Sequence, residues 1–291
     1  MKQAGPLFHY EWRTEGTSVE IFPQTTLKIM VLNDIHVPFH DPAAVDLAIQ
    51  IGKFFRPHII VFNGDIYDFF AISRFSVSPE RKLRLAEELY QTRDIIRNIV
   101  KSINSSQLNI FLTGNHEERL ISYLWSRAPE LSSLKELELE NLLQLHPKEK
   151  WLFLDYKREP QPVGQDVEPR VVIGNLMITH GGKIRMSGNS VNVALNVFRR
   201  LLCNAIIGHW HRADEYIQMN YEGKSYGVWV VPCLCLQRPH WDTGKIWGQG
   251  VGLVTVNEQG FFRTEIVSFI RVDGELLAFF NGKEFKVNVK R

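Results

Sequence analysis

Five short polar segments carry residue types that bind metal ions, and each directly follows an apolar, strand-like run. In chain order they are Asp34-Ile35-His36, Gly64-Asp65-Ile66-Tyr67-Asp68, Gly114-Asn115-His116-Glu117, His180-Gly181 and Gly208-His209-Trp210-His211. Because side chains that follow parallel strands gather at the carboxyl edge of a sheet, we expect these segments to lie together. Their pooled imidazole, carboxylate and amide groups are numerous enough to hold two divalent metal ions.

The donor types in these segments favour transition metals. Asp34 and His36 are two residues apart at a strand end, so both side chains can converge on one ion, and the two oxygens of Asp65 can bridge two ions. Such donors suit Mn, Fe, Zn, Co or Ni better than Mg or Ca, and we expect Mn to support activity in vitro. Five of the ten histidines fall inside the segments, a concentration not typical of core or surface histidines. The predicted ligands are Asp34, His36, Asp65, Asn115, His180, His209 and His211.

The five segments resemble the motifs of the calcineurin-like metallophosphoesterases, namely D-x-H, G-D-x-x-D, G-N-H-E, a lone H and G-H-x-H. The match runs from about residue 28 to about residue 215, and its pattern is similar to that of predicted phosphoesterases from phages and bacteria. The resemblance implies hydrolysis of a phosphate ester by a hydroxide that bridges two metals. It also implies the distribution of ligands: one metal would take Asp34, His36, Asp65 and His211, and the other Asp65, Asn115, His180 and His209.

The resemblance further implies two catalytic residues that do not bind metal. His116 would lie near the leaving-group oxygen and act as an acid or a charge donor, and Asp68 would hold its orientation. Arg119 lies three residues after His116, so on a helix the two share a face, and Arg119 could reach the phosphate or form a surface ion pair. His40 is a second candidate for substrate binding, whereas Glu117 is expected to cap or orient its turn.

One departure from a branch of the family bears on the substrate. Protein Ser/Thr phosphatases of this superfamily continue G-D-x-x-D with Arg-Gly, but Phe69 and Phe70 follow Asp68 here. This difference favours phosphodiesters of nucleotide or nucleic-acid type, with a phosphomonoesterase as the alternative. A non-catalytic scaffold, like the retromer scaffold subunit with this fold, is a more distant alternative. The aromatic segment 239–250 could stack on a base or pack over the end of the sheets.

The elements that position these residues alternate between strands and helices. Strands are predicted at 27–32, 59–62, 108–112 and 205–207, a hairpin at 170–179, and helices at 43–55, 79–101 and 190–202. This rhythm indicates parallel strands with crossover helices, and residues 214–291 are mostly β. The predicted class is α/β (α+β), with two facing mixed β-sheets that form a sandwich flanked by helices. Residues 1–26 are expected to be an irregular, peripheral extension, and residues 118–150 a helical cap.

The bulk composition sets broad limits. A chain of 291 residues that is 44% hydrophobic can form one large domain, and a net charge of +2 argues against a broad basic surface for nucleic acid while allowing a small basic groove. No apolar run is long enough for a membrane span, and the first residues lack the apolar core of a signal peptide. Three cysteines are expected to be buried, reduced thiols, which favours a cytoplasmic protein. The composition predicts no oligomeric state.

Overall fold

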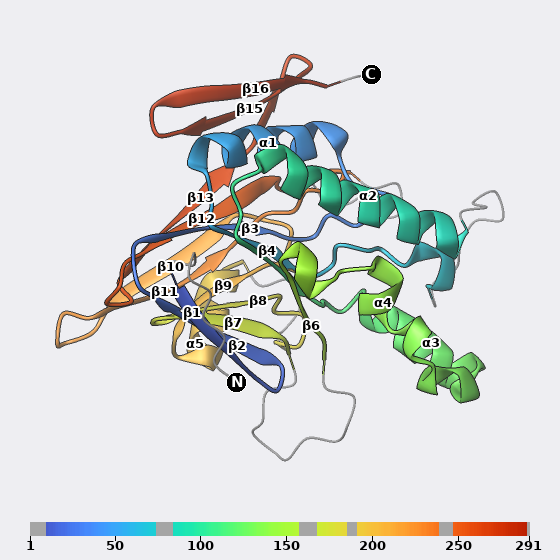
Figure 1. Cartoon of the computed structure of the whole chain (residues 1–291). Coiled ribbons are helices and arrows are strands. Elements are labelled where there is room, and N and C mark those ends of the chain that lie inside the picture. The colour runs from blue at the N-terminus through green and yellow to red at the C-terminus, as the bar shows by residue number, and fades with distance from the viewer. Residues whose placement is uncertain (1–9, 74–83, 157–167, 185–190, 239–246, 290–291) are drawn as a thin grey trace.

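In the computed structural model of the protein, which describes residues 10–73, 84–156, 168–184, 191–238 and 247–289, two β-sheets face each other and helices cover both outer sides (Figure 1). The predicted class, a sandwich of mixed sheets flanked by helices, is confirmed. Within the described residues, no helix is both long and apolar enough to cross a membrane.

The six-stranded sheet has the strand order β13-β12-β3-β4-β5-β6. Four of its strands are parallel, and β12 and β13 extend it with antiparallel pairs. The apolar runs of β4 and β5 are buried on both faces, as is typical of parallel strands covered on both sides. The bounds are β3 Leu27–Leu32, β4 Ile59–Asn63, β5 Leu108–Leu112, β6 Trp151–Leu154, β12 Gly250–Val256 and β13 Phe262–Ser268.

The seven-stranded sheet has the order β1-β2-β7-β8-β9-β11-β10. The predicted hairpin is β7 and β8, and β8 pairs in parallel with β9, so the ends of β8 and β9 lie side by side. The bounds are β1 Tyr10–Glu15, β2 Ser18–Pro23, β7 Arg170–Ile173, β8 Leu176–Thr179, β9 Asn204–Ile207, β10 Asp214–Met219 and β11 Ser225–Val230.

Alternation along the strands builds three hydrophobic layers. On β3, Ile29 and Val31 pack between the two sheets, whereas Met30 and Leu32 pack toward α1 (Pro42–Phe55) and α2 (Leu85–Ile103). On the other sheet, the outward residues of β9 and β11 pack against α5 (Val193–Leu201). Figure 1 shows α1 and α2 on one side of the sheets and α5 on the other.

The start of α1 follows the signal in the sequence. Asp41 caps the helix by accepting the backbone N–H of Ala43 at 3.0 Å, and Pro42 occupies the first turn, where a missing N–H costs nothing. A third, small sheet covers α1, with Phe280 and Phe285 against Phe54. This sheet, which the sequence did not predict as a separate unit, contains β14 Ile270–Val272, β15 Glu275–Phe280 and β16 Lys283–Asn288.

The expectation that residues 1–26 are irregular is wrong for the described part. β1 and β2 form an antiparallel hairpin, and β2 pairs in parallel with β7 at one end of the seven-stranded sheet. Val19 and Ile21 are buried between the sheets. The alternation of buried residues along β2 and its pairing with the distant strand β7 therefore determine the structure here, although the neighbouring residues favour turns.

Two helical predictions need adjustment. The helix expected at 79–101 is α2, which begins at Leu85, and residues 79–83 lie outside the described part of the chain. The segment 118–150 is helical but interrupted: α3 (Glu118–Arg127) and α4 (Leu139–Leu143) are separated by 3₁₀ turns, and the acidic run begins in one of these at Lys135–Leu137. That this segment acts as a cap, and that the chain is a single domain, both stay predictions.

Candidate active site

The polar segments converge where the two sheets meet. Asp34, Asp65 and Asn115 follow the carboxyl ends of β3, β4 and β5, and His180 and His209 follow β8 and β9 of the facing sheet. Asp34, His36, Asp65 and His180 are each at most 3% exposed. Carboxylates and imidazoles that deep in a fold require close partners, because unpaired charge is costly to bury.

One group of donors lies around Asp34. Ligand atoms of Asp34, His36 and Asp65 all lie within 4.8 Å of one another. The Nε2 atom of His211 is 3.1 Å from Oδ1 of Asp34 and 3.2 Å from Nε2 of His36. These four residues are the set expected for one metal.

A second group lies on the other side of Asp65. Ligand atoms of Asp65, His180 and His209 lie within 4.8 Å of one another. Nε2 of His180 is 3.2 Å from Oδ2 of Asp65 and 3.2 Å from Oδ1 of Asn115. Asp65 therefore belongs to both groups, as a bridging carboxylate would.

The chemistry of these donors fits a pair of divalent ions. Nδ1 of His180 faces the carbonyl of Asn63 at 2.9 Å, which leaves its Nε2 lone pair directed at Asp65 and Asn115. Such an outer hydrogen bond is how proteins orient metal-binding imidazoles. Nδ1 of His209 is buried and has no hydrogen-bond partner among the described residues, so this atom is available to a ligand.

The backbone around the donors is strained in a consistent way. Asp34, His36, Asp65, His209 and His211 all have positive φ angles, between 51° and 68°. Left-handed conformations of non-glycine residues cost free energy and gather at functional sites. The surrounding structure therefore holds these five residues in place, although their local preference is for other conformations.

Two glycines make room for the donors. A Cβ atom on Gly64, whose φ is +81°, would lie 2.6 Å from Cγ of His180. A Cβ on Gly114 would overlap the Oδ1 atom of Asp65 and lie 2.5 Å from its backbone nitrogen. A side chain at either position would displace a predicted ligand.

The buried charges offset one another electrostatically. Burial alone would raise the pKa of Asp34 and of Asp65, but the adjacent imidazoles hold both pKa values well below their usual range. Burial alone would lower the pKa of His180, but Asp65 raises this pKa to about 10. An ion that binds here must therefore displace protons.

Next to the two groups, His116 lies among Asp68, Asp65 and Arg119. Its Nδ1 is 2.9 Å from the carbonyl of Asp68 and 3.5 Å from Oδ2 of that residue, and its Nε2 is 3.9 Å from Oδ2 of Asp65. Nη2 of Arg119 donates to Nε2 of His116 at 2.9 Å, an arrangement that assigns the ring proton to Nδ1. Burial lowers the pKa of His116 to about 4, with Asp65 opposing this shift and Arg119 adding to it.

Comparison with known proteins identifies a family that contains this chain. The calcineurin-like phosphoesterase family matches residues 27–225. The chain belongs to this family. Membership makes the protein a metal-dependent hydrolase of phosphate esters and implies a dinuclear divalent metal centre, consistent with the two donor groups that share Asp65.

Individual relatives are distant. The Gene 54 protein of Mycobacterium phage L5 is 24% identical over 266 residues, which cover 86% of this chain and 98% of the relative. Vacuolar protein sorting 29 from Cryptosporidium parvum is 12% identical with a TM-score of 0.39, over 90% of this chain and 96% of its own. A dimetal phosphatase from Danio rerio is 12% identical with a TM-score of 0.36, over 82% of this chain and 98% of its own.

The phosphoesterase site also depends on residues whose contacts the sequence did not predict. Glu117 was expected to orient its turn, and its buried carboxylate accepts four backbone N–H groups, those of Gly114, Asp65, Ile66 and Tyr67, at 2.7 to 3.0 Å. It therefore joins the turn after β5 to the turn after β4.

Glu88, a buried residue of α2, was not predicted as part of the site. Its carboxylate accepts the backbone N–H of Phe69, the residue that follows Asp68. The thiol of Cys235, which sequence reasoning treated only as buried and reduced, lies within 4.8 Å of the ring nitrogens of His36 and His211. Neither residue belongs to a motif, and we find no local signal in the sequence that identifies them.

The two candidate substrate contacts differ in position. Arg119 is part of the site through its bonds to His116 and to the carbonyl of Asp68 at 2.7 Å. His40 pairs instead with the backbone of Cys235 in an isolated bridge and is not a member of either donor group. In the aromatic segment, residues 239–246 lie outside the described residues, but the ring of Trp247 lies 4.1 Å from that of His211, edge to face.

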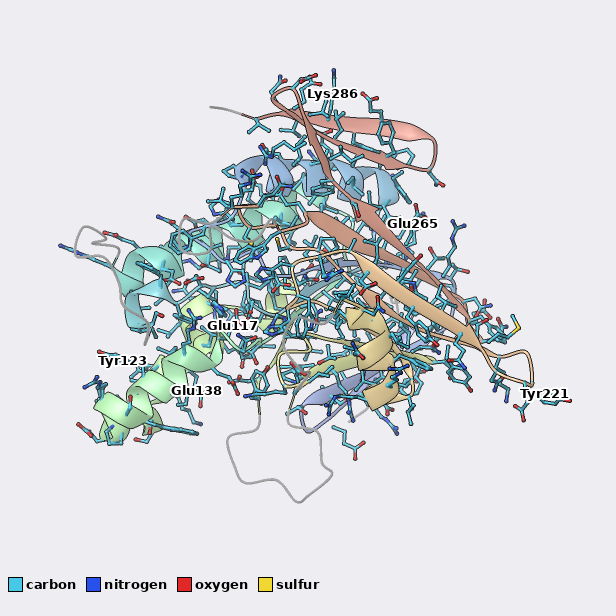
Figure 2. All side chains as sticks on the ribbon, turned by 180° about the vertical axis from the view of Figure 1, so that it is seen from behind. Glu117, Tyr123, Glu138, Tyr221, Glu265 and Lys286 are labelled. Carbon is cyan, nitrogen blue, oxygen red and sulfur yellow. The ribbon has the colours of Figure 1, made fainter. Side chains whose placement is uncertain are left out.

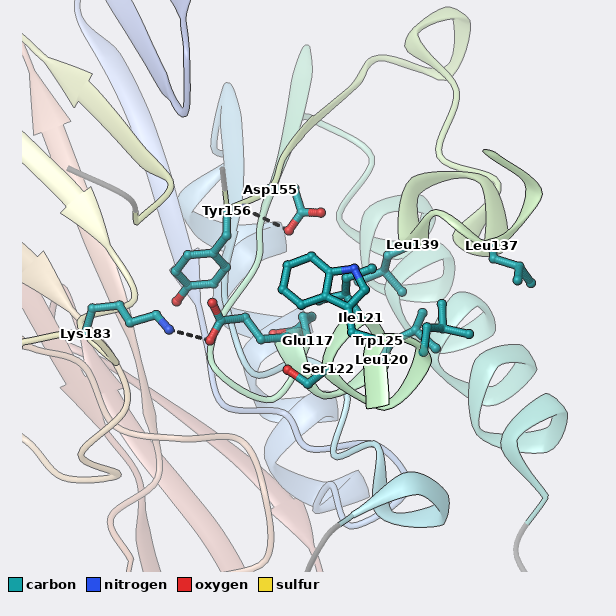
Figure 3. Close-up of a pocket in the computed structure, with 12 residues that line it drawn as sticks. Glu117, Leu120, Ile121, Ser122, Trp125, Leu137, Leu139, Asp155, Tyr156 and Lys183 are labelled. Carbon is teal, nitrogen blue, oxygen red and sulfur yellow. Dashed lines mark hydrogen bonds and ion pairs between the residues drawn. The ribbon is translucent and has the colours of Figure 1, made fainter. Parts of the chain in front are cut away.

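Two cavities flank α3. One, of about 640 Å³, begins at Asn115 and follows α3 through Arg119 to Arg127. The other, of about 300 Å³, lies on the opposite side of α3, where Glu117 and Tyr156 face Trp125 and Leu139 (Figure 3). Lys183 bonds to the carboxylate of Glu118 at 2.5 Å at the mouth of this smaller cavity. Helix α3 therefore lies between the two cavities.

Proposed function

We propose that this phosphoesterase hydrolyses phosphodiesters of nucleotide or nucleic-acid type. In this proposal His116 and Asp68 are the catalytic residues that do not bind metal, and Arg119 is a substrate contact. The metal ligands are Asp34, His36, Asp65, Asn115, His180, His209 and His211. The single observation that carries the proposal is the position of the Asp65 carboxylate, which is shared by two groups of metal-binding side chains.

Two divalent ions bound by these residues, with Mn expected to serve in vitro, would supply a water-derived nucleophile at neutral pH and would neutralise charge on the phosphoryl oxygens. The protein residues contribute the rest of the chemistry. Arg119 donates to the imidazole of His116, and this imidazole lies beside Asp65. In this proposal the two residues face the leaving oxygen as it develops negative charge. Asp68 fixes the ring of His116 through its backbone carbonyl and its carboxylate.

The charge of the site supports a diester over a monoester. A phosphomonoester carries nearly two negative charges at neutral pH, whereas a diester carries one. Among the described residues around His116, Arg119 is the arginine in contact, and it is already bonded to Asp68 and His116. Phe69, which takes the place of the arginine in the protein-phosphatase branch, is fully buried. A diester, which carries one negative charge and releases an alkoxide, therefore fits a site with few positive groups better than a monoester does.

A substrate panel tests the proposal. The Mn-loaded protein is assayed on bis-p-nitrophenyl phosphate, p-nitrophenyl phosphate, cyclic nucleotides and single-stranded DNA. We expect kcat/KM for the diesters to exceed that for the monoester by at least about tenfold, equivalent to about 1.4 kcal/mol of transition-state stabilisation. A preference of similar size for p-nitrophenyl phosphate would assign the protein to the phosphomonoesterases instead.

A further inference from the structure

One face of α3 carries a regular stripe of side chains that leads away from the metal site. Arg119, Tyr123 and Arg127 are spaced by four residues, so they lie one above the other along the helix. At 1.5 Å per residue, the stripe spans about 12 Å. All three side chains line the cavity of about 640 Å³ whose inner end is the predicted metal ligand Asn115.

The charge of this groove is positive. Glu118 is the only acidic residue among the described residues that line it, and its carboxylate is bonded to Lys183 at 2.5 Å. Arg127 is exposed and forms no ion pair with the described residues, so its charge is available. Ser122 and Ser126 add hydroxyl groups along the same wall. Arg127 offers a guanidinium group at the outer end of the groove, and Arg119, although bonded to Asp68 and His116, adds positive charge at the inner end.

Tyr123 adds a second type of contact. Its side chain is 44% exposed, and it lies on the projecting helix, as Figure 2 shows. Apolar residues of α3 instead face the other way, where Ile121 and Trp125 line the smaller cavity (Figure 3). An exposed aromatic ring between two guanidinium groups is the arrangement with which proteins bind single-stranded nucleic acid, since the ring stacks on a base and the cations contact the backbone.

From this stripe we propose that the α3 groove binds a single nucleic-acid strand beyond the scissile phosphate, with Tyr123 stacking on a base and Arg127 contacting a phosphate. The inference rests on the proposed phosphodiesterase function and narrows its substrate class. Because Arg119, which lines the groove, donates to His116, the bound strand in this proposal is on the leaving-group side of the reaction. A local groove of this kind is compatible with a chain whose net charge is only +2.

Binding without turnover provides the test. Fluorescence anisotropy of a labelled oligothymidylate of about twelve nucleotides is measured with the metal-free protein. We expect Arg127→Glu to weaken binding at least about tenfold, and Arg127→Gln to reduce the slope of log K against log salt by about 0.7, one phosphate contact of a single strand. Tyr123→Ala is expected to weaken binding roughly 5- to 100-fold, whereas Tyr123→Phe keeps the ring and stays within about twofold.

Arg200→Glu is the matched control. Arg200 is also an exposed arginine in the last turn of a helix, but α5 ends at the opposite end of β9 from the site. Equal losses for Arg127→Glu and Arg200→Glu, no loss in either, or no binding by the wild type would overturn the proposal. Hydrolysis of bis-p-nitrophenyl phosphate, too small to span the groove, is followed in parallel. Its absence in the Mn-loaded wild type would reject the phosphodiesterase function itself, whatever the anisotropy shows.

Discussion

The carboxylate of Glu117 lies directly behind Asp65 and accepts its backbone N–H at 2.9 Å. The same carboxylate accepts three further backbone N–H groups of the two turns, so it fixes the loop that presents the shared ligand. Removing a hydrogen bond that supports a metal ligand usually lowers metal affinity by about 10- to 100-fold.

We therefore expect Glu117→Gln to lower metal affinity by about 10- to 100-fold and to destabilise the fold by about 1–3 kcal/mol, because an amide NH₂ would face backbone donors. Metal titration calorimetry and thermal unfolding measure the two effects. Glu118→Gln is the control, since its carboxylate binds Lys183 at the surface and not the loop. Equal affinities in all three proteins would mean that the Glu117 bonds do not support the site.

The close packing around Gly114 predicts that a larger residue there disturbs metal binding. A Cβ atom there would overlap the carboxylate of Asp65, so Gly114→Ala should lower both metal content and activity while leaving a folded protein. Gly248→Ala is a suitable control, because the nearest atom to its added Cβ, the Cα of Arg212, is 3.5 Å away, an ordinary contact. Full metal content in Gly114→Ala, measured by elemental analysis, would contradict this account of the turn.

The buried carboxyl group of Glu88 predicts a pH dependence of stability. Burial, and the nearby charge of Asp68, raise the pKa of Glu88 from its ordinary 4.5 to about 7. The folded state thus favours the neutral form. The stabilisation is complete below pH 4.5 and is lost as the pH rises through about 7, a change on the order of 3 kcal/mol.

Chemical denaturation of the wild type and of Glu88→Gln, at pH 5 and pH 8, tests this. The wild type should lose more stability between the two pH values than the variant, which stays neutral throughout. Because other groups titrate in the same range, the difference between the two proteins is the relevant quantity. Parallel pH profiles would show that Glu88 does not ionise in this window.

Variants of His116 distinguish a role in catalysis from a role in metal binding. His116→Ala should keep the wild-type metal content and lose about 10²–10⁴-fold in kcat on esters with poor leaving groups, but much less on p-nitrophenyl esters. Asp68→Asn should show a weaker version of this pattern, and the double variant should be little worse than His116→Ala. The exposed His146→Ala is the control. A loss of equal size on every leaving group would make His116 a phosphate-binding residue.

The fold and the site differ in how far the sequence predicts them. Each polar segment follows an apolar run, so the strand ends and the convergence of Asp34, Asp65 and His180 could be anticipated. The N-terminal hairpin could not, because Val19 is buried through pairing with β7, about 150 residues away in the chain. Likewise, the bonds of Glu88 to Phe69 and of Glu117 to four backbone groups depend on how distant turns pack, and residue spacing does not encode that.

The most direct test of the central claim is the metal stoichiometry of the Mn-loaded chain, measured by elemental analysis for the wild type and for Asp65→Asn. A carboxylate shared by both donor groups predicts two ions per wild-type chain, and fewer than two, with loss of activity, in the variant. Wild-type occupancy that saturates at one ion, or a variant that keeps two ions and full activity, would contradict the shared role of Asp65.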